Sequence, residues 1–109
     1  MAKYLALVKY SPTGLAGARR DGYARRREVL AGAAASLGGN LDAMWFTEGG
    51  EFDFAAVFDV DPDVMYTLTQ IATSTGTASH TKVIALRTAE EADATMAHQY
   101  DWIPPGQTT

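Results

Sequence analysis

The sequence predicts a single domain of the α+β class, in which two helices pack on a four-stranded antiparallel sheet. Three observations predict it. Apolar runs of strand length alternate along the chain with segments whose apolar residues recur at helical spacing. Breaks that contain glycine or proline separate these segments. The length of 109 residues fits one domain.

The first quarter of the chain is expected to hold one strand and the start of one helix. The apolar run from Lys3 to Tyr10 has strand length, and the Ser11-Pro12 and Gly14 that follow it predict a loop over residues 11–22. A helix is expected from Asp21 to Leu37, with Asp21 as its N-cap and Gly38-Gly39 as its C-terminal stop.

A hairpin, a second helix and a fourth strand are expected next. Strand-like runs cover Asn40–Thr47 and Glu51–Val60, and the Glu48-Gly49-Gly50 between them is typical of a hairpin turn. Asp61-Pro62 begins a helix that runs to about Ser74, because proline is tolerated at the first helical position. Ser79–Arg87 is the fourth strand.

A short acidic helix and a tail are expected to complete the chain. Thr88 and Glu91 have the spacing of a capping box, which predicts a helix start. Two prolines in the last segment favour an extended chain. We therefore expect a domain over residues 1–97 and an extended tail over residues 98–109.

The resulting order, β-α-β-β-α-β, is the split βαβ or ferredoxin-like arrangement, with sheet order 4-1-3-2 and both helices on one face. The first and third strands are apolar on both faces, since Leu5, Leu7, Ala55 and Val57 alternate with other apolar residues. A sheet with one solvated face would alternate apolar and polar residues. We therefore expect a second copy to cover the helix-free face, which gives a homodimer whose sheets meet.

Composition excludes several classes of function. The net charge of −4 argues against nucleic acid or an anionic membrane as a partner, because both need a basic face. The absence of cysteine removes disulfides, thiolate metal sites and thiol nucleophiles. With two widely separated histidines as well, no metal site is expected. The apolar run at the N-terminus is too short for a signal peptide or a membrane span, so a cytoplasmic location is expected.

Five short segments stand out by their order and spacing along the chain: Tyr10-Ser11-Pro12-x-Gly14, Gly22-x-Ala24-Arg25-Arg26, Leu37-Gly38-Gly39, Gly50-Glu51-Phe52-Asp53 and Thr81-Lys82. Through these segments the sequence resembles, over roughly residues 3 to 93, the GYD-domain family of small bacterial proteins, which are similar in fold to dimeric α+β barrels. Phe52 stands where the family signature has tyrosine, and His80 stands where arginine is expected. The resemblance implies the fold and a set of candidate residues but no reaction.

In a 4-1-3-2 sheet, the ends of strands one and two and the starts of strands three and four meet at one edge. Most of the residues that match the family lie there, so this edge is the expected site. Asp53 lies just inside an apolar strand, where an unpaired carboxylate is costly. It is interpreted either as a general base or ligand anchor, or as a structural partner for Arg26, which lies on the helix face expected to meet the sheet.

His80 and Lys82 are the next candidates at this edge. An imidazole with an ordinary pKa of about 6.5 can transfer protons at neutral pH, but a lone histidine at a strand start is often structural. Lys82 lies two residues further on the same strand face and could bind a carboxylate or phosphate, or could be simply solvated.

Aromatic side chains with polar atoms complete the expected site. Tyr10, Tyr23 and Trp45 lie near the edge, together with Phe52, and could line the pocket of a flat aromatic ligand. The tail is too short for a core of its own, so Tyr100 and Trp102 are expected to dock on the body or on the second subunit.

Two functions follow from these residues. The first is a cofactor-independent enzyme or ligand-binding protein for a small aromatic or cyclic molecule. In it, Asp53 and His80 transfer protons in an isomerase-, cyclase- or monooxygenase-type reaction, and Arg26 or Lys82 stabilises negative charge. The reaction class comes from analogy of fold alone. The second is a non-enzymatic oligomeric module that binds a protein or a small regulator, in which the same residues are structural.

Overall fold

The structure is a computed structural model that describes residues 1–107. Its elements, in chain order, are β1 (Ala2–Tyr10), α1 (Pro12–Asp21), α2 (Tyr23–Ser36), β2 (Asn40–Phe46), β3 (Phe54–Val60), α3 (Pro62–Ser74), β4 (Ala78–Leu86), α4 (Ala89–Ala94) and a short 3-10 turn, η1 (Thr95–Ala97).

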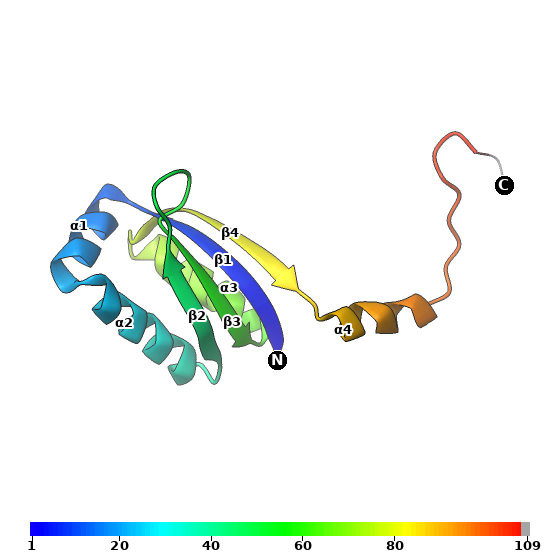
Figure 1. Cartoon of the computed structure of the whole chain (residues 1–109), viewed down its shortest axis with the longest axis horizontal. Helices are drawn as coiled ribbons and strands as arrows, with labels where there is room; N and C mark the ends of the chain where they lie inside the picture. The colour runs from blue at the N-terminus through cyan, green and yellow to red at the C-terminus, as the bar shows by residue number, and fades with distance from the viewer. Residues whose placement is uncertain (108–109) are drawn as a thin grey trace.

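The four strands form one antiparallel sheet in the order β2-β3-β1-β4 (Figure 1). This is the expected 4-1-3-2 order read from the other edge, so the ferredoxin-like α+β prediction is confirmed. Helices α2 and α3 both pack on the same face of the sheet, where side chains from α2, α3, β1 and β3 form one core. Within residues 1–107, no helix packs on the opposite face (Figure 1).

The prediction of a loop over residues 11–22 is wrong, because most of this segment forms helix α1. Ser11 is the N-cap, and its hydroxyl accepts a hydrogen bond from the Gly14 amide at 2.9 Å, while Pro12 takes the first helical position. The same serine and proline that suggested a loop therefore begin a helix. Gly14 is required because a Cβ there would lie 2.1 Å from the Thr77 carbonyl oxygen.

Gly22 separates α1 from α2, which changes the expected start of the second helix. Its φ of 95° lies in the left-handed region that favours glycine, and the chain turns there between the two helices. Asp21 is therefore the last residue of α1 rather than the N-cap of the following helix.

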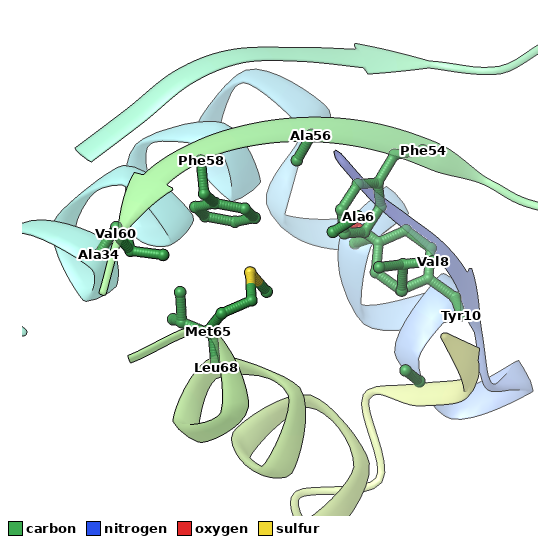
Figure 2. Close-up of a cluster of buried hydrophobic side chains, with 12 residues drawn as sticks. Ala6, Val8, Tyr10, Ala34, Phe54, Ala56, Phe58, Val60, Met65 and Leu68 are labelled. Atoms are coloured by element: carbon green, nitrogen blue, oxygen red, sulfur yellow. The ribbon is translucent and has the colours of Figure 1, made fainter. Parts of the chain in front are cut away.

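The core lies between the sheet and the two helices. Alternate residues of each central strand point into it, among them Val8 and Tyr10 from β1 and Phe54 and Phe58 from β3. Figure 2 shows Tyr10 and Phe54 at one end of this core and Phe58 at the other, with Met65 of α3 below. The two rings at the first end are 5.4 Å apart between centroids.

The other phase of the strands faces away from the helices. Residues directly opposite each other in an antiparallel pair share a face. Leu5 of β1 pairs with Val57 of β3 and with Ile84 of β4, and Leu7 pairs with Ala55. We call this surface, formed by Leu5, Leu7, Ala55, Val57 and Ile84, the open sheet face. Its apolar character matches the sequence pattern, while the homodimer stays a prediction.

The C-terminal segment extends away from the body (Figure 1). The capping box is confirmed, since Thr88 and Glu91 exchange side-chain and backbone hydrogen bonds at the start of α4. Every residue from Lys82 to Gln107 is exposed, and the radius of gyration is 17.6 Å, against about 13 Å for a compact chain of this length. We call residues 88–107 the C-terminal arm. Residues 108 and 109 of the expected tail lie outside the described residues.

Candidate functional site

A cavity of about 130 Å³ lies between the sheet and helices α2 and α3. Its walls come from β1, β2 and β3 on one side and from the inward faces of the two helices on the other. Apart from Arg26, Thr77 and the phenol of Tyr10, these walls are apolar: Val8, Val29, Leu30, Ala33, Met44, Phe54, Leu68, Ile71 and Ala72. We call this space the apolar cavity.

Tyr10 and Arg26 are the ionisable side chains of the apolar cavity. Tyr10 is the last residue of β1 and lies in the phase that faces the helices, so its side chain is only 5% exposed. Burial raises the pKa of the Tyr10 phenol above its usual range, and the nearby Arg26 guanidinium opposes that rise. Tyr10 therefore holds its proton at neutral pH and can donate a hydrogen bond beside a fixed positive charge.

A second cavity, of about 190 Å³, borders the first. Arg26 and Thr77 line both of them. The remaining walls come from one face of α1 and from the loop before β4, and are small or polar: Thr13, Gly14, Gly17, Ala18, Asp21, Thr75 and Gly76. We call this space the polar cavity. The Asp21 carboxylate lies 3.7 Å from Nη1 of Arg26.

Asp53 lies in the turn immediately before β3, rather than inside the strand as expected. Its carboxylate accepts a hydrogen bond from the Tyr10 amide at 2.8 Å and lies 3.5 Å from the Lys9 ammonium. The expected Arg26–Asp53 pair is therefore wrong. Lys9 takes the place of Arg26 because Arg26 lies at the apolar cavity on the helix side of the sheet, where it pairs with Asp21.

His80, Lys82 and Trp45 lie on the face of the sheet opposite α2 and α3. Each is opposite a β1 or β3 residue of that face: His80 pairs with Lys9, Lys82 with Leu7, and Trp45 with Ala55. Phe52 stacks on His80, with ring centroids 5.6 Å apart and planes 18° from parallel. His80, Lys82 and Trp45 are all exposed, and Trp45 keeps 64% of its surface in solvent.

The structure thus divides the expected site into two groups. Tyr10 and Arg26 meet at the apolar cavity. Phe52, Asp53 and His80 lie near the same end of the sheet, but on the open sheet face or beside it. Tyr23 lies near the first group, where its ring packs on Phe46 at 4.6 Å between centroids, and it is 41% exposed. The acid-base roles of Asp53 and His80 stay predictions.

Sequence reasoning missed the helix residues that complete the apolar cavity, among them Ala33, Leu68, Ile71 and Ala72. Their helical spacing was visible in the sequence, but that spacing also describes side chains of a filled core. Thr77 was missed because it lies in a connection with no apolar pattern.

Among residues 1–107, no group of three or more histidine, cysteine or acidic side chains is placed to hold a metal ion. Nor does any helix in that range combine the length and apolar composition that crossing a membrane requires.

Comparison with known proteins gives a family for the chain. None of the curated proteins matches it. The crystal structure of TTHA0845 from Thermus thermophilus aligns over 82% of this chain and 96% of that chain, with 16% sequence identity and a TM-score of 0.39. The family model of the GYD domain matches residues 4–96. Because that match spans most of the sequence, including both sides of the apolar cavity, the chain belongs to the GYD domain family.

Proposed function

We propose that the protein binds a small, largely apolar molecule in the apolar cavity. The observation that carries this proposal is a cavity with apolar walls in which two polar groups, the Tyr10 phenol and the Arg26 guanidinium, lie together. Ligand sites are commonly concave and mostly apolar, with a few polar groups that fix the orientation of the ligand.

The size of the cavity favours a ligand with a single ring. An engineered apolar cavity of about 150 Å³ in another protein stays dry and binds benzene. The cavity here, at about 130 Å³, is close to that size.

The polar pair suits a ligand oxygen that carries or develops negative charge. A protonated phenol next to a guanidinium can donate hydrogen bonds to such an oxygen, in the manner of an oxyanion hole. This is the chemistry that an isomerase, cyclase or oxygenase acting without a cofactor needs at a carbonyl or phenol. The apolar cavity walls, as far as residues 1–107 describe them, contain no carboxylate or imidazole to act as a base. The proposal is therefore binding with stabilisation of negative charge.

We further propose that the protein is a homodimer joined through the open sheet face. Leu5, Leu7 and Val57 are only partly covered within one chain, and a second sheet would remove them from water. Charge favours a copy of the same chain as the partner. The C-terminal arm carries four acidic residues and no lysine or arginine, whereas the Lys82 ammonium lies exposed at the rim of the open sheet face.

The second candidate function, an oligomeric interaction module, is favoured by the C-terminal arm itself. Tyr100 is 83% exposed and Trp102 is 69% exposed, in a segment that extends from the body. Exposed aromatic side chains of this kind are typical of binding surfaces.

A titration with toluene tests the proposed function. Toluene is added to the full-length protein while backbone amide shifts are followed by NMR, and the amides of Ala72 and Thr77 are expected to move. Ala33→Leu fills the cavity from α2 and is expected to abolish the shifts. Ala35→Leu is the matched control, because Ala35 is exposed on the same helix. Equal binding by the wild type and both variants would rule out the apolar cavity as the site.

A further inference from the structure

The apolar and polar cavities share a border at Arg26 and Thr77. From this junction we infer that the ligand is amphiphilic, with a single apolar ring in the apolar cavity and a carboxylate in the polar cavity, bound by Arg26. The inference rests on the proposed function, because it extends the ligand of that same site.

The position of Arg26 supports this assignment. Its side chain is 28% exposed, whereas that of Arg25 on the same helix is 65% exposed, so Arg26 is held against the body between the two spaces. A guanidinium has five N–H donors in a planar fork and binds carboxylates with matching geometry. At the junction it can reach a head group on one side while the Tyr10 phenol contacts the ring side.

The polar cavity contains three threonine hydroxyls, of which Thr13 is the one placed to donate to a carboxylate. The Thr75 hydroxyl donates to the Ile71 carbonyl at 2.6 Å and accepts from the Thr77 hydroxyl at 2.9 Å, so these two hydroxyl protons are already used. Thr13 adds a hydroxyl from the first turn of α1. Gly17 of α1 also lines this cavity and carries no side chain, which leaves room there for a head group.

The charge around the junction favours an anion. Residues 19–27 contain five arginines and one acidic residue, an excess of four positive charges in a chain whose net charge is −4. Glu28, which lies 3.3 Å from Arg25, lowers that excess to three. A local positive field of this kind raises the concentration of an anionic ligand near the cavity mouth.

Asp21 lies where its charge would affect a charged ligand but not a neutral one. Its carboxylate is 49% exposed and lies 3.7 Å from Arg26, so the two form a loose pair that a ligand carboxylate can replace. Asp21 also repels such a ligand. Removing its charge is therefore expected to strengthen the binding of an anion and to leave a neutral molecule of the same shape unaffected.

The test compares phenylacetate with phenylacetamide, which has nearly the same shape without the charge, on the full-length protein by NMR titration. Phenylacetate is expected to bind about tenfold more tightly, as a charged hydrogen bond would give. Arg26→Met is expected to remove this preference, and Arg25→Met, the matched control on the exposed side, is expected to keep it. Asp21→Asn is expected to tighten phenylacetate several-fold with phenylacetamide unchanged.

Four outcomes overturn the inference. Equal affinities for the two probes would mean that the site does not recognise a carboxylate, while the proposed apolar ligand would stand. A preference that survives in Arg26→Met, or a looser binding of phenylacetate to Asp21→Asn, would place the carboxylate elsewhere. Binding of neither probe, together with no response to toluene, would contradict the proposed function as well.

Discussion

The Asp53 carboxylate accepts a hydrogen bond from the backbone amide of Tyr10 at 2.8 Å, and the Asp53 amide in turn donates to the Val8 carbonyl at 2.8 Å. These two bonds hold the end of β1 against the start of β3. The Asp53 carbonyl also accepts from the Thr47 amide at 3.0 Å, which ties in the end of β2. The aspartate of the family signature therefore fixes the backbone of the residue whose phenol enters the apolar cavity.

Replacing Asp53 is expected to lower stability. Asp53→Ala removes a partly buried charged acceptor and should lower the free energy of unfolding in urea by about 1–3 kcal/mol. Asp53→Asn keeps an acceptor oxygen and should lower it less. Asp59→Ala is the control. The Asp59 side chain is 33% exposed and its ion pair with Lys3 is long, at 3.8 Å, so its loss is expected to change the stability little. An Asp53→Ala variant as stable as the wild type would show that this aspartate does not hold the strand ends.

The Tyr10 phenol is expected to ionise at a higher pH than a free tyrosine. Burial is the main cause of its raised pKa. A group whose pKa is raised by folding contributes stability that is complete below the unfolded pKa of about 10, and that is lost as the pH rises through the folded pKa. The difference in ultraviolet phenolate absorbance between the wild type and Tyr10→Phe measures this ionisation. A midpoint at or below that of N-acetyltyrosine amide would contradict the burial of the hydroxyl.

His80→Ala is expected to leave the affinity for toluene unchanged. His80 pairs with Lys9 and stacks on Phe52, on the side of the sheet away from the apolar cavity. Ile71→Ala, at the wall of that cavity, should weaken binding because it removes apolar contacts from the ligand. Both affinities come from the same NMR titration. Loss of toluene binding in a folded His80→Ala variant would mean that the ligand lies on the open sheet face.

A charge placed on the open sheet face is expected to break the homodimer. Ile84 and Val83 are neighbours on β4 and are both 38% exposed, but Ile84 lies on the open face and Val83 on the helix side. Light scattering of the wild type should give twice 11.7 kDa, that is 23.4 kDa. Ile84→Glu should give 11.7 kDa, and Val83→Glu should keep the dimer mass. A wild-type mass of 11.7 kDa at micromolar concentration would refute the dimer.

The sequence predicted the four strands and the two core helices because apolar periodicity and turn residues specify them locally. The strand order followed from the β-α-β-β-α-β succession of these elements. The sequence pattern did not predict helix α1 over residues 12–21, since serine and proline begin both loops and helices. The sequence identified Tyr10 and Arg26 as ligand-binding candidates at one sheet edge, but it paired Arg26 with Asp53 rather than with Asp21.

The division of the candidate residues between two sides of the sheet could not be predicted from the sequence. Tyr10 and His80 were both expected at one edge, which they share, but the face of each depends on cross-strand register. In strands that are apolar on both phases, the pattern does not say which phase meets the helices. The apolar cavity depends on the distance between α2 and α3, which no local pattern records.

A crystal structure of the protein soaked with toluene tests the central claim most directly. The ligand is expected to lie between the sheet and helices α2 and α3, in contact with Phe54, Leu30 and Ile71, and with its ring beside the Tyr10 phenol. Toluene bound on the open sheet face instead, or an empty apolar cavity at a concentration that saturates the NMR titration, would contradict the account.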